Sequence, residues 1–281
     1  MKFLSYLAAG AVLLQVQACS PASKETSPSN GVIPVQSVSI AQVDTPPPVD
    51  SVSPEITLTV PLEALLGKID PAKDTAFAKI EPQFSTKTDI YMRKEAYSAF
   101  KRMHAAAQAD VVKLIILSAT RPFSYQKNIW EAKWTGRTLV GGKNLAATIP
   151  DPAKRALKIL EYSSMPTTSR HHWGTDIDLN NLENSYFASG EGKKIHDWLN
   201  SNGAKFGFCQ TYTSIGAERP HGYQEEKWHW SYMPIASIFL KAYQAQVQYS
   251  DIQGFLGSDV AAELQVIDRY VGGIGPSCKA W

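Results

Sequence analysis

Residues 169–180, SRHHWGTDIDLN, place two adjacent histidines directly before two alternating aspartates. If residues 175–179 form a strand, Asp176 and Asp178 point to one of its faces, and the apolar residues beside them point to the core. Gly174 permits the sharp backbone turn that brings an imidazole back over the carboxylates. Because two neighbouring carboxylates repel each other without a counter-charge, the segment predicts a cation site on the polar face of a strand.

A second segment is expected to complete this site. A catalytic zinc ion takes three protein ligands, and the first segment offers only one or two of them. Residues 225–232, EEKWHWSY, are the best candidate for the third. In a strand, Trp228 and Trp230 face the core while His229 faces the opposite side. Glu226 precedes His229 by three residues, so a turn before the strand places its carboxylate beside the metal. The alternative is a structural histidine that bonds to a backbone carbonyl.

Together the two segments resemble the two signatures of VanY-like D-alanyl-D-alanine carboxypeptidases. The first signature, S-x-H-x-x-G-x-A-x-D, is matched by Ser169, His171, Gly174 and Asp178. The second, E-x-W-H, is matched by residues 226–229. This family belongs to a group of zinc peptidases that also contains lysostaphin-type enzymes and the hedgehog signalling domain. The resemblance covers residues 96–243, and two motifs in the right order make it specific.

The resemblance implies a zinc-dependent D,D-carboxypeptidase that hydrolyses the terminal D-Ala-D-Ala bond of peptidoglycan stem peptides. The implied zinc (Zn2+) ligands are His171, Asp178 and His229, with Glu226 as the catalytic base. The alternatives are an L,D-carboxypeptidase, a peptidoglycan endopeptidase and a non-catalytic zinc-containing lipoprotein that binds the wall. Loops outside the motifs decide between the enzymatic alternatives. A non-catalytic protein is expected to lose the base, and Glu226 is present.

The resemblance also implies contacts with the substrate. Arg121, in the segment SATRPFSYQ at the end of a predicted strand, is implied to contact the substrate or the oxyanion. Its alternative is a surface ion pair. Gln126 and Ser169 are implied as further substrate contacts.

The chain departs from the family pattern at two positions. Asp176 stands where the signature has alanine, and Ser231 stands where many relatives have a basic residue. The additional carboxylate is expected either to orient His171 or His172 or to be solvated. Neither departure touches an implied ligand.

The remaining histidines are weaker candidates. His172 could replace its neighbour as a metal ligand, but the family spacing favours position 171. His221, in a polar loop, could donate a proton in the transition state or be an ordinary loop residue. His104 and His196 lie on predicted helices, and we interpret both as structural.

The N-terminus predicts export. Residues 1–18 combine one positive charge, an apolar run and a small residue before Cys19, and they resemble a bacterial lipoprotein signal peptide. Cleavage leaves Cys19 as a lipid anchor on a membrane facing the periplasm or cell wall; ordinary secretion with a free Cys19 is the alternative. Residues 19–55 are rich in Pro, Ser and Thr and lack aromatic residues, so we expect a disordered tether.

Charge and cysteine content agree with an exported protein. The formal net charge of +2 provides no basic field for nucleic acid. Apart from Cys19, the chain has Cys209 and Cys278. An oxidising compartment favours a disulfide between these two over a pair of free thiols.

Residues 56–250 are expected to form one zinc peptidase domain, with residues 251–281 as an appendage packed on it. Apolar spacing and proline positions predict helices at residues 92–110, 152–162, 192–201 and 234–249. Strands are expected at residues 111–119, 175–179, 204–212 and 227–233. Because helices and strands do not alternate regularly, we expect an α+β fold with a mainly antiparallel sheet and flanking helices. The resemblance implies that this is the zinc fold of D,D-peptidases and hedgehog domains.

Overall fold

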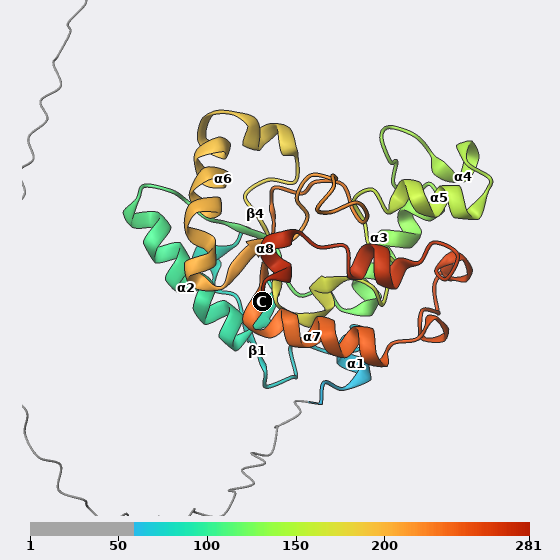
Figure 1. The fold of residues 1–281 in the computed structure, drawn as a ribbon, viewed down its shortest axis with the longest axis horizontal. Helices are drawn as coiled ribbons and strands as arrows, with labels where there is room; N and C mark the ends of the chain where they lie inside the picture. The colour runs from blue at the N-terminus through green and yellow to red at the C-terminus, as the bar shows by residue number, and fades with distance from the viewer. Residues whose placement is uncertain (1–58) are drawn as a thin grey trace, which may run out of the picture. The chain divides into compact units, whose positions relative to one another are not determined.

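The computed structural model describes residues 59–281 (Figure 1). The expected signal peptide, the Cys19 anchor and the tether lie outside the described residues. Within the described part of the chain, no helix is both long and apolar enough to cross a membrane.

A four-stranded antiparallel sheet carries both motifs. In spatial order its strands are β3 (Ile116–Ser118), β4 (Asp176–Leu179), β6 (His229–Tyr232) and β5 (Phe208–Gln210). This sheet confirms the expected α+β fold. The strands are shorter than the sequence predicted. β5 starts only at Phe208, because residues 203–206 form a 3-10 turn that ends at Gly207 with a φ of 84°.

A second, two-stranded sheet was not expected. It pairs β1 (Phe77–Lys79) with β2 (Tyr91–Arg93), and three-residue strands are too short to show alternation in the sequence. The sheet packs against the turn that precedes β4. Gly174 has a φ of 75°, and a Cβ at this position would lie 2.3 Å from the Phe77 ring. The expected turn at Gly174 therefore needs glycine for both conformation and space.

Helices α2 (Lys94–Ala109) and α6 (Gly190–Asn202) cover one face of the four-stranded sheet. Their apolar side chains share a core with Ile177 and Trp230, which point away from the aspartates of β4. Both helices were expected from the sequence, α2 from its apolar spacing and α6 from the glycine near its end. Their packing leaves the opposite face of the sheet for the polar residues.

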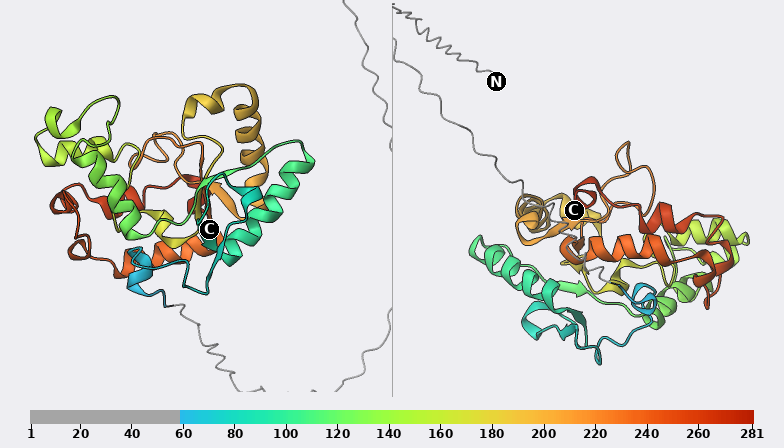
Figure 2. Two further views of the ribbon diagram at one scale, coloured as in Figure 1. Left: turned by 180° about the vertical axis from the view of Figure 1, so that it is seen from behind. Right: turned by 60° about the horizontal axis from the view of Figure 1, so that its bottom comes forward.

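A second core contains the remaining longer helices, which are α3 (Phe123–Trp134), α5 (Pro152–Ile159) and α7 (Met233–Gln246). Figures 1 and 2 show α3 and α5 on the opposite side of the sheet from α2. The short helices α1 (Leu62–Leu65) and α4 (Leu145–Thr148) add Leu65 and Leu145 to this core. Helices α5 and α7 were expected, whereas α3 was not.

The C-terminal segment belongs to the same second core, in which many of its apolar side chains are buried. A disulfide joins Cys209 in β5 to Cys278 in the short helix α8 (Pro276–Lys279), with Cα atoms 5.6 Å apart. The expected disulfide is therefore confirmed. It ties the C-terminal segment to the strand next to β6.

Candidate metal centre

Strand pairing gathers the polar side chains of both motifs on one face of the sheet. In the register of β4 and β6, Asp178 lies opposite His229, and Asp176 lies opposite Ser231. The apolar pair between them enters the core. Because side chains alternate along a strand, the four polar side chains share the other face.

His171 reaches this face from the 3-10 turn Arg170–Trp173, which ends at Gly174. Its Nδ1 donates a hydrogen bond to the carbonyl oxygen of Ala119, at 2.8 Å. Its Nε2 is buried, has no hydrogen-bond partner among residues 59–281, and lies 3.4 Å from Asp178 Oδ1. Burial lowers the pKa of His171, so this nitrogen keeps a free lone pair. A buried nitrogen lone pair that receives no hydrogen bond is suited to bind a metal ion.

Three side chains converge on this lone pair. His171, Asp178 and His229 are all buried, and one potential ligand atom from each lies within 4.8 Å of the others. Two imidazoles and a carboxylate are a donor set for zinc that leaves a fourth position open. Burial alone would raise the pKa of Asp178, but neighbouring positive charge, including that of Arg121, outweighs burial and holds the carboxyl ionised. The residues thus fit the metal that the motifs imply.

Asp176 orients His229. Its Oδ2 accepts a hydrogen bond from His229 Nε2 at 2.9 Å, and its side chain is fully buried. The two outcomes expected from the sequence, orientation of His171 or His172 and solvation, are therefore both wrong. The bond to Nε2 directs Nδ1 of His229 toward Asp178, at 3.6 Å from its Oδ1. An acceptor of this kind fixes the ring orientation of a metal-binding histidine.

Asp176 is itself held by a buried polar network. Arg170 Nε lies 3.2 Å from its Oδ2, while the hydroxyls of Ser231 and Thr175 donate to Oδ1 at 2.7 and 2.8 Å. Arg170 is fully buried and also donates to Ser231. Burial alone would raise the pKa of Asp176, but the charge of Arg170 and the bond from His229 lower it far below the ordinary value. Arg170 is thus the positive charge that pairs with Asp176, and it also donates to the hydroxyl at position 231.

Glu226 lies beside the three converging residues. Its Oε2 is 3.1 Å from His229 Nδ1, and its backbone N–H is bonded to Tyr212 at 2.9 Å. Burial raises the pKa of Glu226 above its ordinary value, although the bond from His229 acts in the opposite direction. For His229 the balance is reversed. Burial alone would lower its pKa, but its hydrogen bonds to Asp176 and Glu226 outweigh burial and raise the pKa to about 9. A buried carboxylate with a raised pKa is suited to accept a proton near neutral pH.

A cleft of about 540 Å³ opens over this group. Its walls are formed by Arg121, Ile129, Lys133, Tyr162, Ser163, Asp178, Leu182, Glu183, Asn184, Ser185, Glu226 and Trp228. Reasoning from sequence missed Lys133 and Tyr162. Lys133 lies on α3, which was not predicted, and Tyr162 lies beyond the observed end of α5. The centroid of the Tyr162 ring lies 6.4 Å from that of Trp228, and both rings line the cleft.

The three implied substrate contacts lie in different places. Arg121 lines the cleft, is 19% exposed, and has its Nη2 3.6 Å from Asp178 Oδ2. Gln126 is fully buried and donates to the carbonyl of Ser164 at 2.8 Å. Ser169 is buried, and its hydroxyl has no partner within the described chain. Only Arg121 is on the cleft wall.

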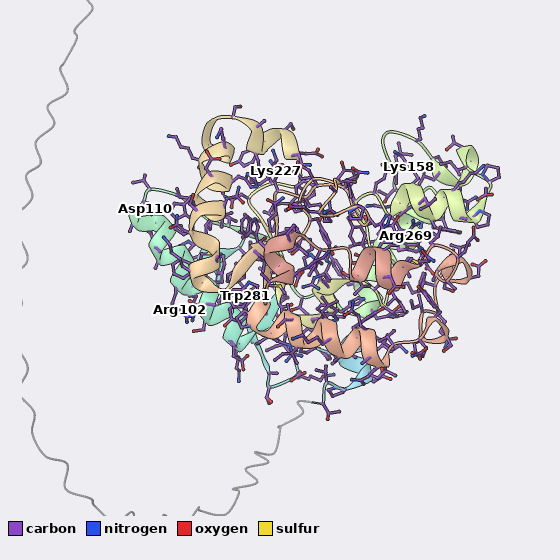
Figure 3. The ribbon with its side chains drawn as sticks, in the orientation of Figure 1. Arg102, Asp110, Lys158, Lys227, Arg269 and Trp281 are labelled. Carbon is purple, nitrogen blue, oxygen red and sulfur yellow. A yellow bond between two sulfur atoms is a disulfide. The ribbon has the colours of Figure 1, made fainter. Side chains whose placement is uncertain are left out.

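The other histidines lie away from the converging ligands. His172 accepts from the N–H of Thr167 at 3.1 Å and donates to the carbonyl of Arg121 at 2.5 Å, so both ring nitrogens are used. Burial lowers the pKa of His172 to about 3. His221 is exposed in a separate surface depression beside Arg269, which Figure 3 labels. The sequence left its role open, and this position favours an ordinary loop residue.

His104 and His196 have structural contacts. The His104 ring packs edge-on against Phe84 with a centroid distance of 4.9 Å. His196 Nε2 bonds to Gln210 Oε1 at 2.8 Å. Both arrangements agree with the structural interpretation.

Comparison with known proteins adds a family to this geometry. The family model described as VanY, D-alanyl-D-alanine carboxypeptidase, matches residues 89–235. A putative carboxypeptidase of Bacillus subtilis, YodJ, is 27% identical over 177 residues, which are 60% of this chain and 56% of the relative. A D-alanyl-D-alanine carboxypeptidase of Enterococcus faecalis is 30% identical over 138 residues, which are 46% of this chain and 44% of the relative. The chain thus spans about half the length of these curated relatives.

Solved structures similar to this chain include VanYB in complex with D-alanine-D-alanine, with 21% identity and a TM-score of 0.45. That match covers 63% of this chain and 87% of the solved one. The LdcB LD-carboxypeptidase is 22% identical with a TM-score of 0.45, and the match covers 65% of this chain and 81% of the other.

Proposed function

Since the chain belongs to the VanY family of D-alanyl-D-alanine carboxypeptidases, we propose that it is a zinc-dependent D,D-carboxypeptidase acting on peptidoglycan stem peptides. The observation that carries the proposal is the partnerless Nε2 of His171 beside Asp178 and His229, at the base of a cleft that also contains Glu226. No bond within the described chain uses this lone pair, whereas a metal ion would.

The zinc ligands in this proposal are His171 through Nε2, Asp178 through its carboxylate and His229 through Nδ1. When bound, zinc polarises the peptide carbonyl and makes water more acidic. His229 must give up its Nδ1 proton before it can bind the metal. Asp176 then keeps the ring in place through Nε2.

Glu226 accepts the proton of the attacking water on its carboxylate and passes it to the amine of the departing D-alanine. Its burial and raised pKa support both steps, because the same group must gain and then release a proton. Arg121 faces the cleft beside Asp178 and is placed to stabilise negative charge that develops on the carbonyl oxygen. The rings of Tyr162 and Trp228 provide an apolar wall for the peptide.

Export and anchoring are part of the same proposal. Residues 1–18 act as a lipoprotein signal peptide, Cys19 carries the lipid, and residues 19–55 form the tether to the peptidase domain at residues 56–250. Residues 251–281 are an appendage that the disulfide holds on this domain. Metabolic labelling with a radioactive fatty acid tests the anchor, and a Cys19→Ser protein is expected to lose the label.

The function is tested by incubating the purified zinc-loaded chain with defined muropeptides and identifying the products by mass spectrometry. Loss of one D-alanine from a pentapeptide, abolished by a chelator, is expected. Loss from a tetrapeptide indicates an L,D-carboxypeptidase, and cutting of a cross-link indicates an endopeptidase. Zinc at one ion per chain without turnover of any muropeptide contradicts an enzymatic function.

Variants separate the base from the ligands. Glu226→Gln is expected to keep one zinc per chain and to lower kcat about 100- to 10,000-fold, because only the proton acceptor is removed. His229→Ala is expected to lose the metal as well. Glu225→Gln changes the neighbouring carboxylate, which does not line the cleft, and serves as the matched control. A fully active Glu226→Gln protein rules out the assigned base.

A further inference from the structure

Lys133 is a cation in the wall of the cleft. It lies in the last turn of α3, and its Nζ donates a hydrogen bond to Ser163 Oγ. Both residues line the cleft together with Arg121 and Glu226. Within residues 59–281, no carboxylate forms an ion pair with Lys133. The hydroxyl of Ser163 holds the ammonium in place but does not neutralise its charge.

Lys127, on the same helix, shows the usual arrangement of a lysine. Its Nζ lies 3.8 Å from Glu131 and donates to the carbonyl of Gly254, outside the cleft. Lys133 has a less favourable environment, because burial and the nearby Arg121 lower its pKa and the charge of Glu226 opposes them only in part. A partly desolvated ammonium that forms no ion pair is unfavourable, and an anionic ligand that binds to it removes this cost.

The two cations of the cleft are not equivalent. Arg121 Nη2 lies 3.6 Å from Asp178 Oδ2, so its charge is already paired with the carboxylate of a proposed zinc ligand. Among the described residues, Lys133 is hydrogen-bonded to Ser163 and forms no ion pair, so its ammonium can receive an anionic group of the substrate. A peptide substrate supplies an anionic group through its C-terminal carboxylate or through a carboxylate nearer its N-terminus.

We propose that Lys133, positioned by Ser163, binds a carboxylate of the peptide substrate and thereby selects peptides that present an anionic group to the cleft. The inference rests on the proposed function and deepens it. A terminal carboxylate at this position favours release of a single terminal residue, because an uncharged chain continuing through the cleft leaves Lys133 without a partner. The carboxylate of the stem-peptide glutamate is the other source of the same chemistry.

The test uses the full chain loaded with zinc and three matched pentapeptides. One has both carboxylates free, one ends in a D-alanine amide, and one has isoglutamine in place of the glutamate. Binding of each peptide to Glu226→Gln protein is measured by calorimetry, and kcat and KM are measured with the active protein. The binding arm gives an answer even where no peptide is turned over, so failure of this inference and failure of the proposed function are distinguishable.

Lys133→Met is expected to weaken binding of the free acid, and to raise its KM, about 10- to 100-fold, as for loss of a hydrogen bond to a charged group. Zinc stoichiometry stays at one per chain. Ser163→Ala removes the hydrogen bond but keeps the charge, so it retains a preference for the acid over the amide. Lys127→Met, the matched lysine outside the cleft, leaves binding unchanged.

The amides identify the carboxylate. If Lys133→Met has no further effect on the terminal amide, Lys133 binds the terminal carboxylate; if it has none on the isoglutamine peptide, Lys133 binds the glutamate carboxylate. Either result supports the proposal. Equal losses on all three peptides overturn it, as does a Lys133→Met protein that binds the free acid like the parent.

Discussion

Replacement of Asp176 is expected to damage the protein in two separable ways. Asp176 and Arg170 form an ion pair in which both side chains are fully buried. Asp176→Ala leaves the guanidinium of Arg170 without a counter-charge, and loss of one partner of a buried pair lowers the free energy of unfolding by about 3–5 kcal/mol. The same substitution removes the acceptor of His229 Nε2, which is expected to weaken zinc binding about 10- to 100-fold.

The double variant Asp176→Ala/Arg170→Met separates these effects. Without the buried charge, the free energy of unfolding is expected to recover by about 2–3 kcal/mol relative to Asp176→Ala, because an apolar replacement of both partners is tolerated better than one unpaired ion. Zinc affinity is not expected to recover, because His229 still has no acceptor. Stability then depends on the pair, whereas zinc affinity depends on Asp176 alone.

Both quantities can be measured independently. Chemical denaturation in the presence of a chelator gives the free energy of unfolding of the metal-free chain, and competition with a chromophoric chelator gives the zinc affinity. Asp197→Ala is the matched control, because Asp197 pairs with Lys193 at the surface with both side chains 57% exposed, and such pairs contribute about 0–1 kcal/mol. A double variant with the zinc affinity of the parent would falsify the orienting role of Asp176. If Asp176→Ala lowers the free energy of unfolding no more than Asp197→Ala does, the buried-pair argument is refuted.

Two further predictions concern stability. The disulfide between Cys209 and Cys278 closes a loop with a sequence separation of 69, so its reduction is expected to lower the free energy of unfolding by about 4 kcal/mol from chain entropy. An unfolding midpoint that does not change in reductant contradicts this, and a Cys209→Ser/Cys278→Ser protein that ignores reductant is the control. In the metal-free chain, the pKa of His229 is raised from 6.5 to about 9, so its stabilisation is complete below pH 6.5 and is lost as the pH rises toward 9. The pKa of His172 is lowered to about 3, so its contribution is complete above pH 6.5 and is lost as the pH falls toward 3. The thermal midpoint in chelator is thus expected to be highest near pH 6.5; a midpoint that still rises between pH 7 and 9 contradicts the role of His229.

Parts of the site were predictable because they depend on local geometry. Alternation along a strand places Asp178 on a polar face whatever the rest of the chain does, and a positive φ at Gly174 returns His171 over that face. The same alternation places His229 opposite Trp230, whose side chain enters the core, whereas Trp228 precedes the strand and lines the cleft. Each of these conclusions needs only residues that are close in the sequence.

Other parts were missed because their partners are distant in the sequence. Asp176 is bonded to His229 and Ser231, 53 and 55 residues further along the chain, and only the register of β4 and β6 brings them together. Helix α3 carries a four-residue spacing of buried residues, but one of them is Gln126, a polar side chain that hides the apolar pattern. Without α3, Lys133 could not be placed at the cleft.

The sequence by itself determined the α+β class with a mainly antiparallel sheet, and its resemblance to VanY-like enzymes implied the residues that converge on the proposed metal. The fold class follows from the periodicity of the segments, which is a local property of the chain, and the ligand set follows from the two motifs. Only the tertiary structure decided that Asp176 holds His229, that Arg170 balances Asp176, and that Lys133 lines the cleft with Ser163 as its hydrogen-bond partner. Hydrogen-bond partners and unpaired charges depend on which distant segments pack together, and that information exists only once the chain has folded.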